Sequence, residues 1–159
     1  MKHDAETLRT HFAELFAHAR WANARIIEVM RSIAAPPEEA VAKLAHIGAA
    51  DEVWQTRLAG ETWKGELFAR PTLEEAARSV EAAGPKWEAI IAQMPAERLL
   101  GEIEYQSTEG TPYSSRTRDV LTHAALHAQY HRGQIATLLK GRVATPAMTD
   151  YILSTRQGR

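Results

Sequence analysis

Apolar residues recur three and four positions apart along most of the chain, which is the spacing of an amphipathic α-helix. The first such stretch covers about residues 4–33 and ends at Pro36-Pro37. The second starts near Pro37 and runs to Gly60, where a glycine suits the end of a helix. The pattern predicts two long helices in this part of the chain.

Two further helical stretches follow. The third opens with Thr72-Leu-Glu-Glu75, a capping box in which the threonine and the glutamate satisfy free backbone N–H groups, and it continues to about residue 94. The fourth covers about 117–140 and closes at Gly141. Four helices of this length in a small chain predict an all-α fold, a four-helix bundle.

One segment departs from the helical pattern. Residues 101–116 alternate at Ile103 and Tyr105 and then contain the turn-like run Ser107-Thr-Glu-Gly110. This predicts a short hairpin or ordered loop before the last long helix, and one more helical turn is expected near 150–156. A chain of 159 residues suits a single domain, which we expect to span residues 1–159.

Composition excludes several classes of function. The net charge is −1, with acidic and basic residues interleaved, so the basic surface of a nucleic-acid binder is missing. The chain has no cysteine, which excludes disulfides, thiolate ligands and a cysteine nucleophile. Neither a signal peptide nor a long apolar run is present, so we expect a cytoplasmic protein that does not bind membranes.

Histidines supply the candidate chemistry. His123, His127 and His131 stand four residues apart in the fourth predicted helix, and residues at that spacing share one helical face. Two of them can bind one metal ion with a third ligand from another helix, for which His46 is the best candidate. His123 and His131 are about 12 Å apart along the axis, so all three cannot bind one ion. Spacing leaves open whether the pair is 123/127 or 127/131.

The alternative is that these are ordinary core histidines that bond to carbonyls or carboxylates. Two imidazoles on one apolar turn favour a metal, because packing them together without an ion costs hydration twice. Asn23 and Asp51 are polar residues within apolar stripes, and they are either satisfied core groups or partners that orient the imidazoles, a role also open to His123.

Three other histidines, His3, His11 and His18, have no convergent partner and are expected to be solvated surface residues. Trp21 lies off the apolar stripe of the first helix. An exposed tryptophan favours a second interface, so a homodimer through this helix is one hypothesis, and a contact with the C-terminal tail is the other.

Three sequence stretches resemble the DinB/YfiT-like metalloenzymes, and the resemblance covers nearly the whole chain. They are His18-Ala-Arg-Trp-Ala-Asn23, His46-Ile-Gly-Ala-Ala-Asp51 with Arg57-Leu-Ala-Gly60 after it, and His123-Ala-Ala-Leu-His127-Ala-Gln-Tyr-His131-Arg-Gly-Gln134. The resemblance implies a bundle of unusual helix order, often dimeric, in which His46, His127 and His131 hold a divalent ion. The resemblance does not imply that His123 is a ligand. Members with known activity include thiol-dependent transferases and isomerases that use bacillithiol or mycothiol.

Three imidazoles on Zn(II) or Ni(II) leave a coordination position free for a substrate, so the site would be catalytic in type. A metal-bound thiol or water loses its proton at neutral pH. The resemblance favours thiol transfer over hydrolysis, and since the chain lacks cysteine, the hypothesis is an S-transferase that joins a low-molecular-weight thiol cosubstrate to small electrophiles. A metal-dependent hydrolase, or a non-enzymatic metal-binding dimeric stress protein, is the alternative. The sequence identifies no general base.

The substrate pocket is expected beside two irregular segments, about 61–71 and 103–113. Trp63, Tyr105 and Tyr113 are the aromatic residues that we expect in its walls.

Overall fold

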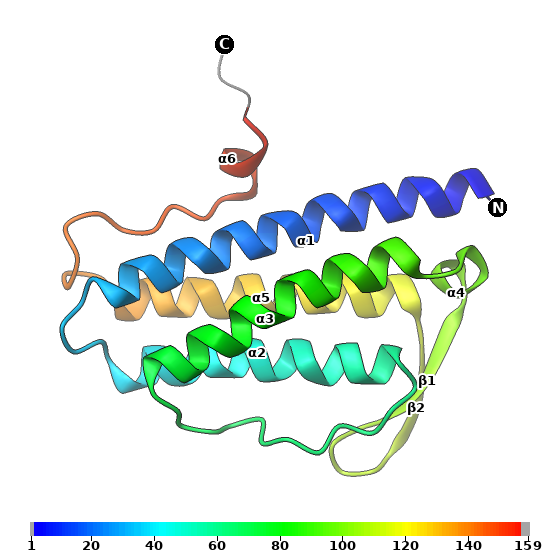
Figure 1. The fold of residues 1–159 in the computed structure, drawn as a ribbon, viewed down its shortest axis with the longest axis horizontal. Coiled ribbons are helices and arrows are strands. Elements are labelled where there is room, and N and C mark those ends of the chain that lie inside the picture. Colours follow the sequence, from blue (N-terminus) through cyan, green and yellow to red (C-terminus); the bar gives the residue numbers. More distant parts are fainter. Residues whose placement is uncertain (1, 157–159) are drawn as a thin grey trace.

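The computed structural model describes residues 2–156, and four long helices lie side by side in it (Figure 1). They are α1 (Lys2–Arg31), α2 (Glu38–Leu58), α3 (Leu73–Gln93) and α5 (Thr117–Leu138). Helix α1 packs against α3 and α5, and α2 packs against the same two helices. The predicted all-α four-helix bundle is therefore confirmed.

Helices α2 and α3 run in the same direction although they are consecutive in the sequence (Figure 1). The connection between them, residues 59–72, therefore returns along the length of the bundle (Figure 1). A short loop would have made the two helices antiparallel. This long return matters for function because it brings irregular backbone alongside the middle of α2.

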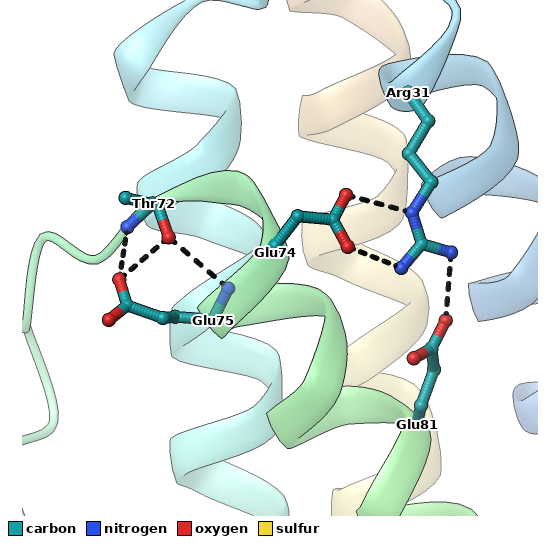
Figure 2. A network of polar contacts seen from close by, with 5 residues as sticks. All are labelled: Arg31, Thr72, Glu74, Glu75 and Glu81. Atoms are coloured by element: carbon teal, nitrogen blue, oxygen red, sulfur yellow. Dashed lines mark hydrogen bonds and ion pairs between the residues drawn. The ribbon is translucent and has the colours of Figure 1, made fainter.

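The N-terminus of α3 is fixed by the predicted capping box (Figure 2). The backbone N–H of Glu75 donates to Thr72 Oγ1 at 3.3 Å, and the backbone N–H of Thr72 donates to Glu75 Oε2 at 2.8 Å. Next to it, Arg31 at the end of α1 forms ion pairs with Glu74 and Glu81 of α3 (Figure 2). These contacts place the start of α3 against the end of α1.

A hairpin covers one end of the bundle, as the alternating segment predicted. Strands β1 (Glu102–Gln106) and β2 (Pro112–Arg116) are antiparallel, with Tyr105 opposite Tyr113. The hairpin follows α4 (Ala96–Leu100), a single turn that the apolar spacing did not predict.

The tail carries α6 (Tyr151–Thr155) across α1, within the range expected for a last helical turn (Figure 1). None of the helices in residues 2–156 combines the length and the apolar character needed to cross a membrane.

Two apolar clusters form the core. One lies toward the hairpin and includes Phe12, Trp87 and Leu121, and the other lies toward the opposite end and includes Ile27 and Leu44. Along α1 and α2 the sequence passes from one cluster to the other through buried polar residues, which are His18, Asn23, Asp51 and Gln55. Buried polar side chains are therefore concentrated between the two apolar clusters, near the middle of the bundle. The candidate site lies in this region.

Candidate metal centre

His46 of α2 faces His127 and His131 of α5, two helices that pack against each other. The Nε2 atom of His127 lies 3.2 Å from Nε2 of His46 and 3.2 Å from Nε2 of His131. One ring nitrogen from each residue can be chosen so that all three atoms lie within 4.8 Å of one another. Of the two pairs that spacing left open, 127/131 is thus the one that the structure brings to His46. We call these three residues the histidine cluster.

The outer nitrogen of two of these rings is held by an oxygen that only accepts hydrogen bonds. His46 Nδ1 lies 3.1 Å from the Leu67 carbonyl oxygen, and His131 Nδ1 lies 2.8 Å from Gln134 Oε1. Each Nδ1 must therefore carry the hydrogen and donate it, so that in a neutral ring Nε2 keeps its lone pair. Both lone pairs point toward Nε2 of His127.

The surroundings of His127 and His131 favour the neutral form of these two rings. Burial, together with repulsion from His131, His46 and His123, lowers the pKa of His127 to about 4. Burial also lowers the pKa of His131, although its hydrogen bond with Gln134 opposes that shift. Neutral imidazole is the form that binds a metal ion.

Nitrogen spacing in the cluster suits a metal ion. A neutral His127 has at most one hydrogen on Nε2, so it cannot fully satisfy both lone pairs that approach it at 3.2 Å, whereas one cation can accept all three nitrogens. Nitrogens bound tetrahedrally at about 2.0–2.1 Å from Zn²⁺ lie about 3.3 Å apart, close to the separations found here. The three residues could therefore hold a divalent ion.

The long connection 59–72 covers His46 from outside. Phe68 stacks on the His46 ring, with centroids 5.2 Å apart and planes only 6° from parallel, and 76% of Phe68 is exposed. Leu67, Phe68 and Gln134 were not predicted from the sequence as residues of the site. Gln134 had a usable signal, since it stands three residues after His131 on the same helix. A backbone carbonyl such as that of Leu67 has none.

His123 lies one turn outside the histidine cluster. Its ring packs on Trp54 at 5.3 Å and on His127 at 5.6 Å between centroids. Burial and the nearby Arg57 lower its pKa. His123 therefore connects the histidine cluster with the aromatic residues at the end of α2.

Asn23 and Asp51 are both buried, and their polar contacts go to residues other than the histidines. Asn23 Oδ1 accepts a hydrogen bond of 2.9 Å from Arg132, whose other terminal nitrogen donates to Gln129 at 2.8 Å. Burial raises the pKa of Asp51 to about 7, and Trp87 and Arg132 oppose that shift. We call Asn23, Asp51, Gln129 and Arg132 the arginine cluster. This cluster adjoins the histidine cluster, because Arg132 directly follows His131 in the sequence.

His18 corrects one prediction. It was expected at the surface with His3 and His11, which are exposed, but only 6% of His18 is accessible. The tail covers it: His18 Nδ1 lies 3.0 Å from Ser154 Oγ, and the Tyr151 ring packs edge-on at 5.1 Å. A contact made by residues so distant in sequence leaves no trace in the periodicity of α1.

Trp21 is half-buried beside these residues and packs on His18 and under the Arg25 guanidinium. The homodimer through α1 stays a prediction.

A cavity of about 840 Å³ lies between the hairpin, the end of α2 and the connection 59–72. Trp63, Tyr105 and Tyr113 line it, as expected for the walls of a pocket. The described residues of its wall do not include the three histidines. A row of rings from Tyr105 through Trp54 and His123 to His127 connects the two.

The chain matches a known protein family. The family model that matches is that of the DinB family, and it spans residues 1–158. No curated protein matches the chain.

Proposed function

The chain belongs to the DinB family, and on that premise we propose that it is a metal-dependent S-transferase in which His46, His127 and His131 hold a divalent ion. One observation carries the proposal. The Nε2 atoms converge at 3.2 Å while the outer nitrogens of His46 and His131 are fixed by a carbonyl and an amide oxygen. Such fixed orientation by a further hydrogen bond is typical of histidines that ligate metals.

A Zn(II) or Ni(II) ion bound there supplies an open coordination position that lowers the pKa of a thiol or of water. The residues of the chain would hold the ion, favour the neutral form of His127 and His131, and cover one face of the His46 ring with Phe68. Because the chain has no cysteine, the thiol has to come from outside. Its proton leaves to solvent, its sulfur forms a bond to the electrophilic carbon, and the leaving group departs with the electron pair of the broken bond.

The test measures thiol consumption. Protein loaded with Zn(II) or with Ni(II) is mixed with 1-chloro-2,4-dinitrobenzene and one thiol at a time. The thiols are bacillithiol, mycothiol, glutathione and cysteine. We expect at least one thiol to react faster than without protein, and His127→Ala to return the rate to the uncatalysed value. His11→Ala is the matched control, because it removes an exposed histidine on α1 and should keep the full rate.

Failure of every thiol to react faster would contradict the transferase. Turnover of an ester or amide without any thiol, lost in His127→Ala, would support the hydrolase instead. Metal binding without either reaction would favour a non-enzymatic metal-binding protein.

A further inference from the structure

The cavity beside the hairpin contains one cationic side chain among the described residues that line it, Arg57. Its guanidinium carbon lies 4.6 Å from the centroid of the Trp54 ring and 5.0 Å from that of Tyr105. The two rings pack edge-to-face against each other at 5.2 Å. Two aromatic rings therefore hold the planar guanidinium in place.

Arg57 has nothing to donate to within the described chain. In residues 2–156 no carboxylate lies within 4.0 Å of its nitrogens and no hydrogen bond leaves its guanidinium, although Glu109 attracts it through space. Burial lowers the pKa of Arg57, yet a guanidinium stays protonated at neutral pH. A half-buried cation in the wall of a cavity, with donors that no described residue accepts from, can bind an anion from outside.

We propose that Arg57 binds the carboxylate of a small-molecule ligand in this cavity. The guanidinium fork matches the two oxygens of a carboxylate. Glu61 and Glu104 also line the cavity, so its charged side chains sum to −1, which repels a phosphate dianion more strongly than a singly charged carboxylate. Tyr105 and Tyr113 offer apolar surface for the body of the ligand.

This site deepens the proposed function and rests on it in one respect, namely that the other end of the ligand reaches the histidine cluster. Arg57 follows His46 by eleven residues on the same helix, which corresponds to about 16 Å along its axis. The row of rings through Trp54 and His123 connects the two places. The expected ligand is therefore extended, with its acidic group far from its reacting atom.

The experiment measures binding without a thiol or an electrophile. Isothermal titration calorimetry at low ionic strength compares 3-phenylpropionate with 3-phenylpropan-1-ol and 3-phenylpropylamine, which differ only in the charge of the end group. We expect saturable binding of the carboxylate alone. Arg57→Gln should weaken it at least about tenfold, the loss of a charge-assisted hydrogen bond. Arg70→Gln, an equal change of charge at an exposed residue outside the cavity wall, should leave it unchanged.

Three results would overturn the proposal: no binding to the wild type, equal binding of the alcohol, or an equal loss in Arg70→Gln. His127→Ala separates this site from the metal centre and should retain binding. Loss in His127→Ala with retention in Arg57→Gln would place the carboxylate on the metal and also overturn it.

If Arg57→Gln does not fold, ¹⁵N NMR of the wild type decides. The Nε–Hε signal of Arg57 should shift on adding 3-phenylpropionate, and an unchanged signal would overturn the proposal. Neither measurement depends on turnover, so a failed transferase assay leaves this result independent.

Discussion

Two polar clusters lie in the middle of the same bundle, and they are satisfied in opposite ways. In the arginine cluster the chain provides acceptors for both terminal nitrogens of Arg132, namely Asn23 and Gln129, and only its Nε lacks a partner among the described residues. In the histidine cluster two fixed lone pairs meet the third ring, and the chain provides no cation between them. What distinguishes a site for an outside ligand from a structural polar group is thus a partner that the chain does not provide. Burial alone does not distinguish the two.

The difference extends to charge. Burial lowers the pKa of His127 to about 4, so this ring is neutral at pH 7 and ready to bind a cation. Asp51 and Arg132 are both buried ionisable groups, and they attract each other through space although no ion pair within 4.0 Å joins them among the described residues. The first cluster should therefore respond mainly to metal, and the second mainly to mutation and pH.

The largest effect is expected from His127→Ala, which removes the ring that both other histidines approach. Elemental analysis should find about one metal ion per wild-type chain and close to none in the variant. The variant should also lose the rise in melting temperature that added metal gives the wild type, because binding to the native state stabilises it by mass action. Equal, stoichiometric metal in both proteins would contradict the role of His127 as a ligand.

Arg132→Met should have the next largest effect, on stability instead of metal content. It leaves the buried Asn23 Oδ1 without its donor and removes the positive charge that attracts Asp51, and a buried acceptor left without a donor costs about 1–3 kcal/mol. Urea unfolding measures the change in the free energy of unfolding. Arg20→Met, which breaks an exposed pair with Glu88, is the control and should cost less than about 1 kcal/mol.

A double variant sharpens this result. If Arg132 matters because it compensates Asp51, replacing both residues, as Arg132→Met with Asp51→Leu, should recover part of the lost stability. A further loss in the double variant would mean that Arg132 acts through its packing alone.

Asp51→Asn tests the same cluster through pH. The native pKa of about 7 lies above the unfolded value of 3.8, so between these values the native state holds a proton that the unfolded state lacks. The stability that Asp51 contributes is therefore full below pH 4 and falls by about 1.4 kcal/mol per pH unit up to about pH 7. Asparagine does not titrate, so the variant should lack this fall when both metal-free proteins are unfolded with urea across that range. Parallel curves would contradict the assignment.

Much of the fold could be predicted from the sequence because its signals are local. The three- and four-residue spacing of apolar residues located the four long helices. Thr72 marked the start of α3 through its capping box, and Gly60 marked the end of α2, where the structure gives it a left-handed φ of 76°. Helix α4 was missed because five residues are too few to show a helical period. The parallel course of α2 and α3 could not be read from periodicity, which is the same for either direction.

The candidate site was predictable only where its residues share an element. The spacing of His127 and His131 placed them on one turn, whereas the approach of His46 depends on how α2 packs against α5. The Leu67 carbonyl could not be predicted, since every residue carries one. His18 was wrongly expected at the surface because, as with His46, its surroundings depend on tertiary packing. The tail that covers it is more than a hundred residues away in the sequence.

The smallest effect, and the finest test of the comparison, concerns two glutamines on α5. Gln134 accepts from His131 in the histidine cluster, and Gln129 accepts from Arg132 in the arginine cluster. Gln134→Leu should weaken metal binding about 10- to 100-fold, because His131 loses the partner that fixes its ring. Gln129→Leu makes the same chemical change on the same helix and should leave metal affinity intact while lowering the free energy of unfolding. Competition with a chromogenic chelator measures the first quantity and urea unfolding the second. If both variants weakened metal binding alike, the two clusters would act as one unit. The distinction between a cluster that needs a metal ion and one that the chain itself satisfies would then fail.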